Sequence, residues 1–179
     1  MESKIYDVII KELVSHGDER GFFREIVRCT DDVFKDAKFG QLSHSHMIKN
    51  TVKAWHYHNI QFDFWYIPTG LVKVILYDDR EASPTYRVHQ EFTVGDTLTY
   101  PEAKALCIRI PTGVLHSCKV LSESADLFYI TSETYNPQDE GRYPYNNSPY
   151  KYDWGENVIV VPNDTKRTIP SNERKKIKI

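Results

Sequence analysis

The stretch AWHYHNIQFDFWYIPTG, residues 54–70, carries the clearest pattern in this sequence. Two histidines stand two positions apart, His56 and His58, and the acid Asp63 follows before an aromatic run and a Pro-Thr-Gly turn. Alternate residues of a β-strand point to the same face of a sheet, so His56 and His58 project together. If that face is the inside of a barrel, both rings enter one cavity. The stretch is then a metal site, a catalytic base with neighbours, or a buried strand.

Short β-rich runs surround this stretch and are separated by Gly, Pro, Asp or Ser. They occupy residues 4–13, 21–30, 51–58, 62–79, 85–94, 96–101, 104–111, 117–124 and 126–135, and a turn at Gly70 divides the run 62–79 into two strands. Many short strands at this spacing predict an antiparallel sandwich or barrel. Residues 31–39 carry a short helix-like pattern. From residue 136 the chain is rich in Pro, Asn, Gly and Tyr, which predicts an ordered coil packed on the barrel.

Length and charge restrict the class of protein. The 179 residues predict one domain, and a formal net charge of -2 provides no basic footprint for nucleic acid. We expect no membrane partner and a cytoplasmic location, because no apolar run could span a bilayer and the N-terminus lacks a signal-peptide pattern. Three cysteines without a CxxC pair fit reduced thiols. We expect the domain at residues 1–165 and a polar, basic tail at 166–179.

A second histidine motif stands later in the chain. The run IPTGVLHSCKV, residues 110–120, places His116 just after a Pro-x-Gly turn. In spacing and order the two motifs resemble the signatures of the cupin superfamily, with Asp63 in place of the usual Glu and Val120 in place of a closing Asn. The resemblance implies an all-β double-stranded β-helix, the cupin or jelly-roll barrel, here with a short helical segment and a C-terminal coil.

The two motifs together provide a possible set of metal ligands. Imidazole and carboxylate groups suit a divalent transition metal. The candidate ligands are His56, His58, Asp63 and His116. The alternative is that one buried histidine packs beside its neighbour while Asp63 is a carboxylate of a surface turn. Both interpretations stay open at this point.

Further motifs resemble the dTDP-4-dehydrorhamnose 3,5-epimerase family, a branch of the cupins, over roughly residues 4–165. Each of them matches a family segment in its proper order along the chain. The matching stretches are DERGFFRE at 18–25, GQLSHS at 40–45, VKAWHYH at 52–58, YDDREASPT at 77–85, the run 110–140 and YNNSPYKYDW at 145–154. We therefore identify the chain as a divergent member of this family.

The resemblance implies a nucleotide-sugar epimerase or isomerase that acts on a 4-keto-6-deoxyhexose, with a dTDP-linked substrate and no required cofactor. It also implies a homodimer in which the N-terminal strand is exchanged or pairs between protomers. A base removes a proton next to the keto group, and an acid returns one to the opposite face. By position, His56 matches the base, Tyr129 the acid and Asp164 the carboxylate that orients the histidine. The residues matching contacts to the substrate are Arg20, Glu25, Gln41, Lys53, His116 and Tyr135. Arg20 could instead cap a turn with Asp18.

The sequence departs from the family pattern at positions that would take part in the reaction. A family lysine that stabilises the enolate oxygen corresponds to Asp63, counted back from Gly70, and a carboxylate there would repel the enolate. His58 stands where the family usually has Gln. A divalent metal could replace the lysine, but a metal-bound His56 could not also be a free base. Two alternatives therefore remain: a metal-dependent cupin sugar ketoisomerase, and a noncatalytic cupin that binds a nucleotide sugar or a metal.

Overall fold

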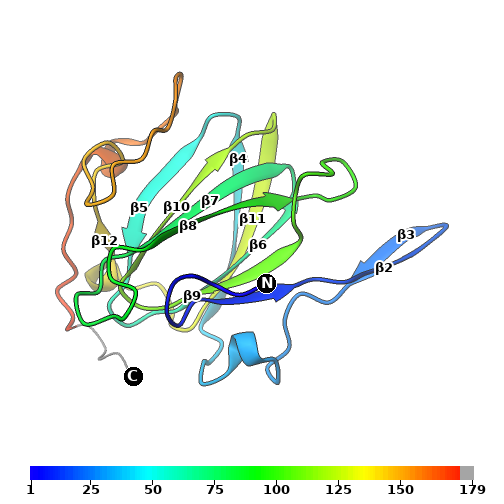
Figure 1. The fold of residues 1–179 in the computed structure, drawn as a ribbon, viewed down its shortest axis with the longest axis horizontal. Coiled ribbons are helices and arrows are strands. Elements are labelled where there is room, and N and C mark those ends of the chain that lie inside the picture. The colour runs from blue at the N-terminus through cyan, green and yellow to red at the C-terminus, as the bar shows by residue number, and fades with distance from the viewer. Residues whose placement is uncertain (174–179) are drawn as a thin grey trace.

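Two five-stranded antiparallel sheets face each other across the core (Figure 1). In the computed structural model, residues 1–173 are described. The first sheet has the order β1 (Ile9–Glu12), β9 (Leu106–Ile110), β6 (Asp63–Thr69), β11 (Ser124–Thr131) and β4 (Gln41–Ile48). The second sheet has the order β12 (Gly141–Arg142), β5 (Val52–Tyr57), β10 (Val114–Val120), β7 (Leu71–Asp78) and β8 (His89–Gly95). The predicted all-β barrel is confirmed.

The remaining elements are short. A separate hairpin of β2 (Ser15–Asp18) and β3 (Gly21–Arg24) extends away from the barrel (Figure 1). Single 3-10 turns form at η1 (Asp32–Phe34), η2 (Pro137–Asp139) and η3 (Pro162–Thr165). The helix-like pattern at 31–39 thus forms one 3-10 turn, which buries Val33 and Phe34. Nowhere in residues 1–173 is there a helix with the length and apolar character that crossing a membrane requires.

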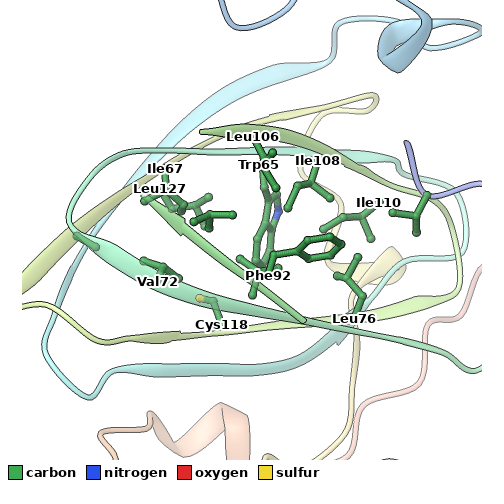
Figure 2. Close-up of a cluster of buried hydrophobic side chains, with 14 of the residues drawn as sticks. Trp65, Ile67, Val72, Leu76, Phe92, Leu106, Ile108, Ile110, Cys118 and Leu127 are labelled. Atoms are coloured by element: carbon green, nitrogen blue, oxygen red, sulfur yellow. The ribbon is translucent and has the colours of Figure 1, made fainter. Parts of the chain in front are cut away.

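The core fills the space between the sheets. Figure 2 shows Trp65, Ile108 and Ile110 of the first sheet pointing toward Leu76 and Phe92 of the second. Strict alternation along the strands produces this core, because every second side chain of β6 and β9 faces inward. The outer face of the second sheet is covered by the C-terminal coil through aromatic side chains, as the composition predicted. These include Tyr143, Tyr145, Tyr150, Tyr152 and Trp154.

The strands differ from the prediction at several places, as at 117–124, where β10 spans Val114–Val120. The predicted strand at 96–101 is wrong: this segment is a turn in which the Asp96 carboxylate accepts from Thr99 Oγ1 at 2.5 Å. Local side-chain hydrogen bonds of this kind compete with sheet pairing. The predicted strand at 21–30 ends at Arg24. Strand β4 was not predicted, because its sequence QLSHSHMI is mostly polar and it lies at a sheet edge.

A buried ion pair closes the end of β7. The Asp78 carboxylate accepts hydrogen bonds from Arg80 Nε at 2.7 Å and Nη2 at 2.9 Å, and from the hydroxyls of Ser83 and Thr85 at 2.6 and 2.7 Å. Arg80 also donates to the carbonyl of Tyr6 at 2.6 Å, which ties the N-terminal segment to the barrel. Burial alone would raise the pKa of Asp78, but the hydrogen bonds outweigh it and hold the pKa below its usual value.

All three cysteines are free thiols, with Cys29 exposed and the other two buried. Burial raises the pKa of Cys107 to about 12 and that of Cys118 to about 11, so both remain protonated near neutral pH. Contacts with the barrel continue past residue 165, because Arg167 donates to the hydroxyl of Tyr57 at 3.0 Å. Residues 174–179 of the predicted basic tail lie outside the described residues.

Candidate active site

A cavity of about 210 Å³ opens between the two sheets. Strands of both sheets supply its walls, together with the loops that follow β5 and η2. The lining residues from the first sheet are Gln41, Asp63, Trp65, Leu127, Tyr129 and Thr131; the others are Lys53, His56, His58, Gln61, His116, Tyr135, Glu140 and Arg142. The barrel interior therefore holds a polar site beside its apolar core.

Most of the sequence-predicted site residues meet in this cavity. The residues that line it are His56, His58, Asp63, Gln41, Lys53, His116, Tyr129 and Tyr135. The alternation along β5 explains the pair of histidines, since His56 and His58 leave the strand on one face. In β10, His116 pairs directly with His56 of β5, which brings the two motifs together. Asp63 is 4% exposed, so it is not the surface carboxylate that we considered as an alternative.

His56 has a carboxylate partner from the far end of the chain. Its Nε2 lies 3.2 Å from Oδ1 of Asp164, which is buried in η3. The amide of Tyr145 donates to the Asp164 carbonyl at 2.8 Å and so anchors this turn. Arg142 Nη1 lies 3.6 Å from the same carboxylate oxygen. Since a carboxylate accepts, His56 donates from Nε2, and Nδ1 is the nitrogen left to accept a proton.

Tyr129 faces the cavity from the opposite wall. It lies in β11 of the first sheet, opposite Trp65 of β6 in the strand register, whereas His56 lies in β5 of the second sheet. The cavity thus presents an imidazole on one side and a phenol on the other. A flat ring between them would meet a proton acceptor on one face and a proton donor on the other.

Three buried groups converge deeper in the cavity: His58, Asp63 and His116. Nε2 of His58 lies 3.9 Å from one oxygen of Asp63, and Nε2 of His116 lies 3.7 Å from the other. Burial lowers the pKa of His116 to about 3, although the Asp63 charge opposes this, so the ring is neutral near pH 7. His56 lies outside this cluster, because its Nε2 contacts Asp164 instead.

The loop between His58 and Asp63 is held by a residue that the sequence analysis missed. The buried carboxylate of Asp139 accepts from the amides of Asn59 and Gln61 at 3.0 and 3.1 Å, and also from the amide of Ile60. Other missed residues line the cavity. Period-2 counting from Asp63 and Tyr129 would have found Trp65, Leu127 and Thr131; no comparable signal in the sequence marks Gln61, Glu140 or Arg142.

Arg20 and Glu25 do not reach the cavity of their own chain. Arg20 lies in the turn of the β2–β3 hairpin and pairs with Asp18 at 2.5 Å, with 84% of its side chain exposed. Glu25 follows β3 and pairs with Arg28. Within one chain the structure therefore shows Arg20 as a turn residue beside Asp18, and a contact between Arg20 and substrate would require a second chain.

Comparison with known proteins agrees with the fold. The family model of dTDP-4-dehydrorhamnose 3,5-epimerase matches residues 2–171. The chain is 37% identical to the Bacillus subtilis spore coat polysaccharide biosynthesis protein SpsL, over 82% of this chain and 94% of that protein. It is 30% identical to the dTDP-4-dehydrorhamnose 3,5-epimerase of Salmonella typhimurium, over 86% of this chain and 84% of that enzyme.

A solved structure gives the same result. The chain is similar to the dTDP-6-deoxy-D-glucose-3,5-epimerase RmlC of Legionella pneumophila in complex with dTDP-4-keto-L-rhamnose, with a TM-score of 0.84 and 25% identity. The match covers 99% of this chain and 98% of that enzyme. The family predicted from the sequence motifs is thereby confirmed, and with it the class of enzyme. This chain belongs to the dTDP-4-dehydrorhamnose 3,5-epimerase family of isomerases.

Proposed function

We propose that this protein epimerises a dTDP-linked 4-keto-6-deoxyhexose at C3, C5 or both, to supply a sugar for polysaccharide synthesis. The observation that carries the proposal is the His56–Asp164 pair facing Tyr129 across one cavity. The similarity to SpsL supports a role in a polysaccharide pathway. Free thiols persist in reducing compartments, which supports the cytoplasm as the place of the reaction.

His56 and Tyr129 divide the proton transfers between them. Asp164 holds the Nε2 proton of His56, so Nδ1 removes the proton from the carbon next to the keto group. The electron pair moves into an enolate, and the Tyr129 hydroxyl returns a proton to the opposite face of that carbon. His56 then releases its proton to solvent and Tyr129 regains one. Atoms and charge balance, and the configuration of one carbon is inverted.

The size of the cavity supports a nucleotide that lies at its mouth. At about 210 Å³ it is smaller than the roughly 300 Å³ at which pockets begin to enclose a drug-sized ligand. The sugar ring fits inside, and the diphosphate and base extend outward. Lys53 lines the cavity and can pair with a phosphate as a point charge. The nucleotide needs further contacts beyond those of the cavity wall.

A second chain can supply these contacts. The outer face of the first sheet carries an apolar cleft of about 360 Å³, lined in part by Leu42, Phe64 and Phe128. Leu42 and Phe23 are 57% and 64% exposed, and apolar surface of this kind marks an association site. We therefore place a homodimer on this face, with the β2–β3 hairpin of one protomer bringing Arg20 to the nucleotide of its partner.

Subunit complementation tests the dimer. Arg20→Ala and His56→Gln each disable one part of the site. If Arg20 acts across the dimer, random exchange of subunits gives hybrids with one intact site, and activity returns to about one quarter of the wild-type value. A mixture that stays inactive after verified exchange, or a monomer in sedimentation equilibrium at assay concentrations, would contradict this arrangement.

Deuterium incorporation tests the proposed reaction itself. We expect the protein to exchange the C3 or C5 proton of dTDP-4-keto-6-deoxyglucose with heavy water, and NMR identifies the carbon. Inversion at an exchanging carbon would establish epimerisation. Movement of the carbonyl without inversion would instead identify a ketoisomerase. Binding of the sugar nucleotide with no exchange would contradict the proposal and favour a noncatalytic binding protein.

A further inference from the structure

Two buried histidines and a buried carboxylate converge inside the barrel. His58, Asp63 and His116 are 6%, 4% and 3% exposed, and they come from three different segments of the chain. Each offers a ligand atom, and all three atoms lie within 4.8 Å of one another. All three residues line the open cavity, where an ion or a ligand can reach these atoms.

The hydrogen bonds of the rings fix which nitrogen faces the cluster. His58 donates from Nδ1 to the carbonyl of Asp139 at 3.2 Å, and His116 donates from Nδ1 to the carbonyl of Val114 at 3.1 Å. In the neutral form of each ring, Nε2 is then the nitrogen that carries the lone pair. Histidines that bind metals are typically held in this way, with the other ring nitrogen bonded to a backbone carbonyl or a carboxylate.

Asp63 is held with equal precision. Oδ1 accepts from Gln61 Nε2 at 2.7 Å, and Oδ2 accepts from Trp65 Nε1 at 3.1 Å. These donors orient the carboxylate but leave lone pairs toward the two imidazoles. The separations of 3.9 and 3.7 Å from His58 and His116 are too long for hydrogen bonds. Within residues 1–173, neither Nε2 has a hydrogen-bond partner.

We propose that His58, Asp63 and His116 bind one divalent transition-metal ion. Ligands at about 2.0–2.2 Å from a shared ion lie roughly 3–3.5 Å apart. The three ligand atoms here lie within 4.8 Å of one another, so side-chain shifts of up to about 1 Å bring them onto one ion. Two imidazoles and one carboxylate suit zinc, iron(II), cobalt or nickel. Three protein ligands leave coordination positions open on the side of the cavity, where an oxygen of a ligand can bind.

This site removes the conflict between a metal and a catalytic base. His56 was one of four candidate ligands in the sequence, but the structure turns it to Asp164 and leaves a cluster of three. A metal in the cluster and a free His56 can therefore act in one cavity. If the proposed function holds, the metal polarises the keto oxygen where Asp63 alone would repel an enolate.

Cobalt binding without any sugar tests the site. The chelator-treated protein is titrated with Co²⁺ and followed by its visible absorption bands and by calorimetry. We expect one ion per chain in the cluster. His58→Gln and Asp63→Asn should each weaken binding by at least about 100-fold. As a check that needs no variant, Zn²⁺ should raise the melting temperature of the wild-type protein.

His46→Gln is the matched control. His46 also contacts a carboxylate, that of Asp126 at 2.8 Å, but on the surface. We expect this variant to bind Co²⁺ as the wild-type protein does. No saturable binding by the wild type, unchanged binding by folded Asp63→Asn, or loss only in His46→Gln would each overturn the proposal. Because no substrate is present, such a failure leaves the proposed epimerase untouched, whereas failed deuterium exchange by a cobalt-binding protein would reject only the reaction.

Discussion

Replacing His56 with Gln should lower kcat by about 10²- to 10⁴-fold, the usual contribution of a general base. Glutamine places an amide donor near the position of Nε2, so the contact with Asp164 can persist while the proton acceptor is lost. Substrate binding should therefore change little, and KM should stay near the wild-type value. Steady-state kinetics with the keto sugar nucleotide, together with the rate of deuterium exchange, measure both quantities.

Tyr129→Phe separates the two proton transfers. The base remains, so deuterium exchange should continue in this variant while inversion is lost with the phenolic proton. His46→Gln, a histidine substitution on the surface, should leave both rates unchanged. If His56→Gln kept wild-type exchange, the base would have to be another group. Loss of exchange in both His56→Gln and Tyr129→Phe would show that the acid and base roles are not divided between these two residues.

Asp78→Asn should remove about 3–5 kcal/mol from the free energy of unfolding, because the substitution leaves the buried Arg80 guanidinium without its counter-charge. Asparagine also offers fewer acceptor sites to the Ser83 and Thr85 hydroxyls that now donate to the carboxylate. Urea denaturation followed by tryptophan fluorescence measures the change. A loss below about 1 kcal/mol, the scale of a surface ion pair, would show that the network contributes little.

Asp18→Asn provides a control with the same sequence spacing. Asp18 and Arg20 form the same Asp-x-Arg contact, with Oδ1 accepting from the Arg20 amide at 2.9 Å, but the pair is exposed. The urea midpoint of this variant should equal that of the wild type.

The stabilisation that Asp78 provides also depends on pH. The folded pKa of Asp78 lies below the ordinary value of 3.8, so its stabilisation is complete above that pH and is lost as the pH falls through the folded value.

The sequence predicted the parts of the site that local periodicity controls. Strand alternation places His56 and His58 on one face, and the glycine turn before β10 places His116 against them. It could not show which ligand set forms, because the direction of the His56 ring depends on Asp164, a contact between residues 108 positions apart. It also could not assign Arg20 to its own cavity or to that of another chain, since the path of the hairpin depends on tertiary packing.

The missed elements have local causes as well. Residues 96–101 have β-forming composition, yet the Asp96 carboxylate bonds to Thr99 and turns the chain. Strand β4 has a single leucine followed by alternating serine and histidine, so its hydrophobic signal is weak, and it is recognised only through its pairing with β11. In both cases the hydrogen bonds of the folded chain decide the local structure against the secondary-structure propensity of the residues.

The separation of His56 and Asp164 along the chain also fixes an order of assembly. A polypeptide emerges from the ribosome from its N-terminus, so the strands up to Thr131 are available before the coil that carries Asp164. The proposed catalytic pair is therefore among the last contacts to become possible. A growing chain can build the barrel and its cavity, but the His56–Asp164 contact can form only once synthesis has passed η3.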